Sequence, residues 1–402
     1  MKGSPIIALS MMIFLSMIST VYPETKKFKI GKYSSSPLIT LSPDGLNFGV
    51  NFYLGEKMYL FLNGTSYGGY ETAGPPVFSS SDSKYGFGYQ QGGKWYNNIN
   101  GTVYGGYDLC GPNVFSHDGK SFGFSYTKDG KKYININGTT FGGYEKTGKV
   151  IISDDGSKFG FWYKLNEKCF ININGKEFSA YQWADDPVFS ADGSYYAFSY
   201  LKDGKRTIIL NGDVFGEYEG VGSFAFSADG SVFAFDYSQN HEWYVNVNGK
   251  IYFGYNIAEV PALSPDGSKF AFWYEYGDHP GTGKGYVNMN GTSHGGYYEG
   301  GRFVFSPDCS SYAIIYWKGS QTFADINGKT YGGYKMASDP LFSPDSSKFG
   351  FVYQQGGKWY VNVNGTQTKG PYQSVEFTIN QDNVMVIAYI KDSYLYFEEL
   401  KL

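Results

Sequence analysis

Residues 114–144 read VFSHDGKSFGFSYTKDGKKYININGTTFGGY, and this stretch contains the pattern that decides the fold. Short runs of alternating apolar and polar residues are separated by Asp-Gly and Asn-Gly pairs. Tyr133-Ile134-Asn135-Ile136 places its two Ile on one face with a period of two, as a half-buried strand requires. Asn137-Gly138 is a two-residue hairpin signal in which both residues take positive φ. The stretch therefore predicts four short antiparallel strands.

The same pattern recurs along the chain, and its most regular position is a serine, which we call the anchor. The anchors are Ser42, Ser79, Ser116, Ser153, Ser190, Ser227, Ser264, Ser306 and Ser343, with Asn380 in the tenth place. Every interval is 37 residues except Ser264 to Ser306, which is 42. Such a period is typical of stacked or radial repeats. Four short strands bounded by Gly, Asn and Asp turns make one blade of a β-propeller.

The two ends of the repeat region complement each other. Residues 27–33 match only the fourth strand of a unit, whereas residues 374–400 match only the first three. Pairing them would close the array and remove two exposed strand edges. We therefore predict an all-β propeller of about ten four-stranded blades over residues 25–402. Two five-bladed propellers would give the same periodicity, although no linker marks a junction near residues 219–222.

The first turn of several units carries a more specific motif. It reads Ser-Pro-Asp-Gly at residues 42–45 and 264–267, with close variants at residues 306–309 and 343–346. These units resemble the WD40-like, or TolB-type, propeller repeats of exported bacterial proteins over about residues 27–399. The resemblance implies a propeller that mostly supplies binding surfaces. The Tyr-Gly-Gly-Tyr fourth strand, as at residues 67–70, is not part of that hallmark.

Residues 1–24 lie outside the repeat and have the character of a secretory signal. Lys2 precedes an apolar run, residues 6–21, which is followed by polar residues. The sequence offers no cleavage site of the small-residue type. We expect a secreted or periplasmic protein, with a membrane anchor formed by residues 5–22 as the alternative.

Composition and motifs give little support for catalysis or for cofactors. The net charge of −4 is too small to attract nucleic acid. Residues 64–68 and 291–295 match a nucleophile motif, but both fall on hairpins, whereas that motif needs a strand-to-helix turn. The four histidines are scattered over different units, so we expect no metal site. The recurrent turn Asp is explained by capping of its own turn. We expect no cofactor.

Comparison of the units with each other indicates where a ligand would bind. The first-to-second and third-to-fourth turns lie on one side, the turn face, and are monotonous. The other connections form the loop face, which varies. Four residues before each anchor, beside the central channel, ionisable groups of both signs occur. The five-residue insertion and a lone loop Trp lie on this face too. The candidate binding residues are Lys149, Trp183, Asp186, Asp278, His279, Lys284, Arg302, Asp339 and Glu376.

We therefore predict a non-enzymatic scaffold that binds a peptide, a protein loop or a glycan on the loop face. The alternative is a glycoside-processing enzyme in which Asp186, Asp339 or Glu376 supplies the acid, base or nucleophile. Two of these carboxyl groups about 5–10 Å apart in one pocket would favour the enzyme. Asp339 and Glu376 lie on adjacent blades and are the better placed pair.

Overall fold

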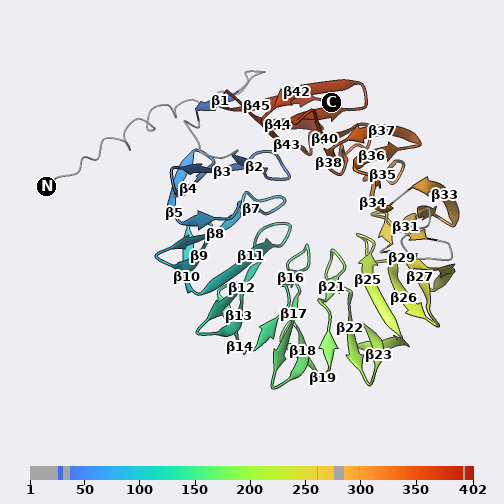
Figure 1. Ribbon diagram of the computed structural model, residues 1–402. Helices are drawn as coiled ribbons and strands as arrows, with labels where there is room; N and C mark the ends of the chain where they lie inside the picture. The colour runs from blue at the N-terminus through green and yellow to red at the C-terminus, as the bar shows by residue number, and fades with distance from the viewer. Residues whose placement is uncertain (1–25, 30–36, 260, 276–284, 298, 393) are drawn as a thin grey trace.

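The computed structural model describes residues 26–29, 37–259, 261–275, 285–297, 299–392 and 394–402. These residues form 45 strands and no helix. The strands make ten antiparallel sheets, which are arranged as blades around one central opening (Figure 1). Within this part of the chain we find no helical segment capable of crossing a bilayer. The protein is a ten-bladed β-propeller, as the sequence predicts.

The first three blades follow the repeat units in order. Blade 1 contains β2 (Leu38–Leu41), β3 (Phe48–Leu54), β4 (Lys57–Leu62) and β5 (Thr65–Tyr70). Blade 2 contains β6 (Thr72–Ala73), β7 (Val77–Phe78), β8 (Tyr85–Gln91), β9 (Lys94–Ile99) and β10 (Thr102–Tyr107). Blade 3 contains β11 (Leu109–Phe115), β12 (Phe122–Lys128), β13 (Lys131–Ile136) and β14 (Thr139–Tyr144).

The next three blades continue the array. Blade 4 contains β15 (Lys146–Thr147), β16 (Ile151–Ile152), β17 (Phe159–Leu165), β18 (Lys168–Ile173) and β19 (Lys176–Tyr181). Blade 5 contains β20 (Trp183–Ala184), β21 (Val188–Phe189), β22 (Tyr196–Lys202), β23 (Lys205–Leu210) and β24 (Asp213–Tyr218). Blade 6 contains β25 (Gly220–Phe226), β26 (Phe233–Gln239), β27 (Glu242–Val247) and β28 (Lys250–Tyr255).

The last four blades complete the circle. Blade 7 contains β29 (Ile257–Ala258), β30 (Ala262–Leu263), β31 (Phe270–Glu275), β32 (Gly285–Met289) and β33 (Thr292–Tyr297). Blade 8 contains β34 (Glu299–Phe305), β35 (Tyr312–Lys318), β36 (Gln321–Ile326) and β37 (Lys329–Tyr334). Blade 9 contains β38 (Met336–Ala337), β39 (Leu341–Phe342), β40 (Phe349–Gln355), β41 (Lys358–Val363) and β42 (Gln367–Tyr372). Blade 10 contains β43 (Ser374–Ile379), β44 (Val384–Lys391), β45 (Tyr394–Lys401) and β1 (Lys26–Lys29).

The innermost strand of blades 2, 4, 5, 7 and 9 is divided into two short strands, a detail that the repeat pattern alone does not predict. Prolines occupy the break in four of these five blades, at Pro76, Pro187, Pro261 and Pro340. Proline has no N–H to donate to the sheet, so the pairing is interrupted there. The channel wall is therefore less regular than the outer strands.

Blade 10 joins the two ends of the chain, as predicted. β1 pairs with β45 in antiparallel register, with Lys26 opposite Phe397. Blade 10 also packs against blade 1, because Ile39 and Phe52 share an apolar cluster with Ile390. Thr378 Oγ1 donates a hydrogen bond of 2.7 Å to the carbonyl of Pro43 across the same junction. The ten blades therefore form one closed ring.

The anchor serine is buried and organises the first turn of each blade. Ser190 Oγ donates to Asp192 Oδ1 at 2.6 Å and accepts from the N–H of Tyr195 at 2.9 Å. Asp192 Oδ1 also accepts from the N–H of Ser194 at 3.0 Å. The hydrogen bond from Ser190, followed by those from Ser194, lowers the pKa of Asp192 to about 2. Turn capping therefore accounts for the recurrent Asp.

The Tyr-Gly-Gly-Tyr strand has a packing explanation. The last Tyr of one blade stacks on the next blade, as Tyr107 does on Tyr126, with ring centroids 4.0 Å apart. Tyr126 in turn stacks on Tyr133 of its own blade at 5.1 Å. A Cβ at Gly142 would lie 2.0 Å from Tyr133 Cδ1, so the first Gly leaves room for this aromatic ring. Gly143 has φ of 86° next to a register shift, which favours glycine.

Gly142→Ala is expected to destabilise the protein, because the added methyl group overlaps the Tyr133 ring. Overpacking of this kind costs about 1–3 kcal/mol of the free energy of unfolding. Urea unfolding of the variant and the parent measures the difference. Thr139→Ala, on the same strand but exposed, serves as the control. Equal midpoints for Gly142→Ala and the parent would contradict this packing account.

Candidate functional site

The spacing of 37 residues places the variable channel positions of neighbouring blades next to each other. Lys149 and Asp186 are such a pair on blades 4 and 5, and the N–H of Lys149 donates to Asp186 Oδ1 at 3.0 Å. Burial raises the pKa of Asp186, and the hydrogen bond from Lys149 opposes this effect. Sequence comparison therefore identified two residues that do meet, although the contact uses the backbone of Lys149 rather than its ammonium group.

Trp183 lies on β20 of blade 5, three residues before Asp186, and is half exposed, with 46% of its surface accessible. Its indole lies near that of Trp162 from blade 4, with ring centroids 5.7 Å apart and planes tilted by 41°. Trp183 Nε1 donates to Asp185 Oδ1 at 3.2 Å, which fixes the orientation of the indole. An exposed indole held in this way offers a fixed aromatic face to a ligand.

A polar cluster centred on Asp185 contacts the Trp183 indole. Asp185 forms an ion pair with Arg206 and accepts a hydrogen bond from the hydroxyl of Ser199. The Asp186 carboxylate and the Trp162 indole converge on Gly148, where a Cβ would lie 2.2 Å from Asp186 Oδ1 and 2.3 Å from Trp162 Nε1. A side chain at this position would displace one of these two groups, so Gly148 allows them to approach each other. We call Trp162, Trp183, Asp185, Asp186 and Arg206 the blade 4–5 rim cluster.

A second adjacent pair lies on blades 8 and 9. Arg302 Nε is 3.1 Å from Asp339 Oδ1, and the Arg302 guanidinium lies 5.6 Å from the ring centroid of Trp317. Both partners are partly exposed. The charges of these two candidate residues are thus directed at each other.

Glu376 lies on β43, at the wall of the channel, and remains exposed to solvent. Surrounding protein nevertheless displaces part of its hydration, and this desolvation raises the pKa of Glu376. Glu376 belongs to blade 10 and Asp186 to blade 5, and these two blades lie on opposite sides of the central opening (Figure 1). The remaining candidates, Asp278, His279 and Lys284, lie outside the described residues.

Sequence reasoning missed Trp162 and the ion pair between Asp185 and Arg206. Trp162 stands nine residues after its anchor, in the middle of the second strand, a position that also varies between blades. The residues at this position in blades 1 to 9 are Asn51, Gly88, Ser125, Trp162, Ser199, Asp236, Trp273, Ile315 and Val352. The same comparison of units that singled out the position four residues before the anchor would also have identified this position, nine residues after it, as variable.

Comparisons with known proteins agree with the fold but give no family. No protein-family model matches the chain, and none of the curated proteins does. Among solved structures, the β-propeller domain of the Trilobed protease from Pyrococcus furiosus is similar at 11% identity and a TM-score of 0.38, covering 65% of this chain and 96% of that one. TolB from Acinetobacter baumannii is similar at 14% identity and a TM-score of 0.30, covering 70% and 77%.

A third similar structure is the β-propeller domain of Cps50 (Swd1) from Myceliophteria thermophila, at 8% identity and a TM-score of 0.32, covering 63% of this chain and 98% of that one. At these identities the likeness concerns the fold alone. The resemblance to WD40-like and TolB-type propellers is confirmed at that level, on the ten four-stranded blades themselves. The chain is a β-propeller.

Proposed function

We propose that the protein is an exported, non-enzymatic binding scaffold that holds its ligand at the blade 4–5 rim cluster. The observation that carries this proposal is Trp183, a large indole left half exposed on a rigid blade and oriented by Asp185. The signal-like residues 1–24 support export. The loop face differs between blades, which is where a rigid repeat scaffold acquires specificity.

A glycan is the ligand class that this cluster fits best. The face of a sugar ring stacks on an indole, while carboxylates accept hydrogen bonds from its hydroxyl groups. Asp185 and Asp186 supply such acceptors beside the two indoles, and Arg206 supplies donors. A peptide or protein loop with an aromatic residue could use the same indole faces. It would need fewer acceptors than the rim provides.

A glycan array probed with the mature protein, with peptide pull-down in parallel, tests this proposal. Trp183→Ala is expected to weaken binding of any glycan found by at least tenfold, as loss of a central aromatic contact does. Leu109→Ala is the matched control, because Leu109 occupies the same strand register in blade 3 and is 50% exposed. Equal loss in both variants, or none in Trp183→Ala, would contradict the assignment of the site.

A glycoside-processing enzyme is the second candidate, and the raised pKa of Glu376 favours it, since a general acid needs such a shift. Asp339 on the adjacent blade would be its partner, but Asp339 is ion-paired with Arg302. Incubation of array ligands with the parent and with Glu376→Gln distinguishes the two candidates. Hydrolysis by the parent that is lost in Glu376→Gln would support the enzyme, whereas unchanged ligands would support the scaffold.

A further inference from the structure

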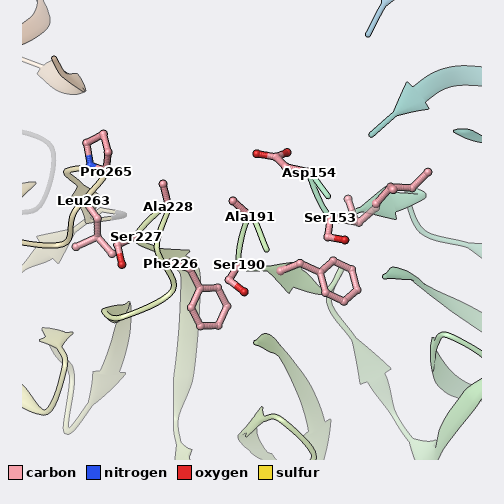
Figure 2. Close-up of a pocket in the computed structure, with 12 residues that line it drawn as sticks. Ser153, Asp154, Ser190, Ala191, Phe226, Ser227, Ala228, Leu263 and Pro265 are labelled. Carbon is pink, nitrogen blue, oxygen red and sulfur yellow. The ribbon is translucent and has the colours of Figure 1, made fainter. Parts of the chain in front are cut away.

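A pocket of about 360 Å³ lies on the turn face, between blades 4 and 7, away from the rim cluster. Apolar side chains of four successive blades line it, among them Ile152, Phe189, Phe226 and Leu263. In Figure 2 the side chains of Asp154, Ala191, Ala228 and Pro265 form a row above those of the anchors Ser153, Ser190 and Ser227. The volume lies in the range of sites for small ligands. We call it the turn-face pocket.

Small residues open the pocket at its centre. The residue after the anchor is Ala in blades 5 and 6, at Ala191 and Ala228, whereas most other blades carry a larger side chain there, such as His117 or Pro307. The anchor hydroxyls themselves are used in their turns, as Ser227 Oγ donates to Asp229 at 2.6 Å. Any ligand would therefore contact the apolar wall and the rim rather than the serines.

At the pocket, one backbone hydrogen bond between neighbouring turns is absent among the described residues, as it also is between the turns of blades 7 and 8. The N–H of His117 donates to the carbonyl of Asp154 at 2.8 Å, and the N–H of Asp155 donates to the carbonyl of Ala191 at 3.0 Å. Between the turns of blades 5 and 6 the described residues form no such bond, and the bond from Asp229 to Pro265 is longer, at 3.3 Å. Ala228 is an exposed residue, and its carbonyl accepts no backbone hydrogen bond from the described turns, so this oxygen remains available to a donor on a ligand.

Asp154 is the only ionisable residue among those that line the pocket, and Asp192 and Asp229 lie in the turns next to it. Hydrogen bonds, first from the anchor serines, lower the pKa of Asp192 and of Asp229, so both carboxylates are ionised at neutral pH. Asp154 adds an exposed carboxylate at the pocket itself. The nearest described lysine of blade 7, Lys269, directs its Nζ to the carbonyl of Cys309 at 2.5 Å, toward blade 8. A cation is therefore the charge that complements Asp154 at the pocket.

We propose that the turn-face pocket binds a cationic amine carried by an apolar body. The apolar part would lie against Phe189, Phe226 and Leu263, and the ammonium group would lie at the rim, near Asp154 and the Ala228 carbonyl. Free aryl- or alkylamines and lysine side chains of peptides share this chemistry. The site is independent of the proposed function, because it lies on the opposite face of the propeller.

Ligand-observed NMR titration with three probes of the same shape tests the charge requirement. The probes are 2-phenylethylamine, 2-phenylethanol and 3-phenylpropanoate. We expect the amine to bind several-fold more tightly than the alcohol and the carboxylate to bind most weakly, with the preference reduced at high salt. Equal affinities for the three probes, or no binding of the amine, would overturn the proposal.

Two variants test the location. Ala228→Phe fills the pocket from an exposed position and is expected to weaken amine binding at least tenfold, whereas Ser80→Phe at the same turn position of blade 2 should not. Asp154→Asn should weaken it about threefold, and Asp82→Asn, which removes an equal charge from blade 2, should not. If Ala228→Phe is folded and binds the amine as tightly as the parent does, the assignment of the site to this pocket is overturned.

A peptide arm distinguishes the two sources of the ligand. The probes are the acetylated, amidated peptides Gly-Lys-Leu-Gly and Gly-Glu-Leu-Gly. Binding of the lysine peptide more tightly than the free amine would assign the pocket to peptides, and weaker binding would assign it to small amines. Preference for the glutamate peptide would contradict the proposal.

Discussion

Deletion of residues 25–34 is expected to lower the melting temperature and to cause aggregation, because it removes β1 from the shared blade. The strand has four residues, and loss of about four backbone hydrogen bonds would cost about 4 kcal/mol, or roughly 5 °C in a chain of this size. The deletion also leaves β45 as an unpaired edge, which favours association with other chains. Differential scanning calorimetry and light scattering of the truncated and parent proteins measure both effects.

The control for this truncation is removal of residues 278–282, the insertion of the seventh unit. Stability depends only weakly on the length of a connection between strands, so the melting temperature of this variant should remain close to that of the parent. Deletion of residues 25–34 should destabilise the whole ring, since blades 1 and 10 share one apolar cluster. A truncated protein that melts with the parent would contradict closure by β1.

Asp236→Asn is expected to stabilise the protein at pH 8 by about 3 kcal/mol and to have little effect at pH 4. Asp236 is 3% exposed on β26, and burial, together with the nearby charge of Glu259, raises its pKa to about 6. Its ordinary pKa is about 4, and a shift of two units corresponds to about 3 kcal/mol. The neutral amide keeps an acceptor for the N–H of Ser223, which now donates to Asp236 Oδ1 at 2.9 Å.

The pH window follows from the proton balance. Between about pH 4 and 6 the folded protein retains a proton on Asp236 that the unfolded chain releases, so the stability of the parent falls as pH rises through this range. The Asp236→Asn variant has no titrating group at this position, so its stability does not fall in this way. Urea unfolding at both pH values measures it, with the exposed Asp213→Asn as a control of equal charge change. A variant no more stable than the parent at pH 8 would contradict the burial account.

The fold was accessible to sequence reasoning because one repeat unit contains its whole blade. The strands of blade 3 fall where the alternation and the Asn137-Gly138 turn predict them. Closure was accessible as well, because the missing strand at one end of the chain matches the surplus at the other. Asn380 can replace the anchor Ser because its Oδ1 accepts from the N–H groups of Asp382 and Val384, each at 3.0 Å.

The site was only partly accessible, since it is formed between blades rather than within one. Comparison of single columns found Asp186 and Trp183, but contact between Trp162 and Trp183 depends on how blade 4 packs against blade 5. The turn-face pocket is lined by residues of four blades, and the monotonous Ser-x-Asp-Gly pattern of a single unit does not indicate how they come together. Such features follow from inter-blade geometry, which no individual repeat contains.

The turn-face pocket requires that blades 4 to 7 be consecutive parts of one ring, because residues of all four blades line it. Distances between spin labels test this directly, with labels placed in pairs at the exposed positions Lys57, Lys205 and Lys391 of blades 1, 5 and 10, after replacement of the three native cysteines. One ring predicts a short distance between blades 1 and 10 and a much longer one between blades 1 and 5. A short distance between blades 1 and 5 would contradict the single ring.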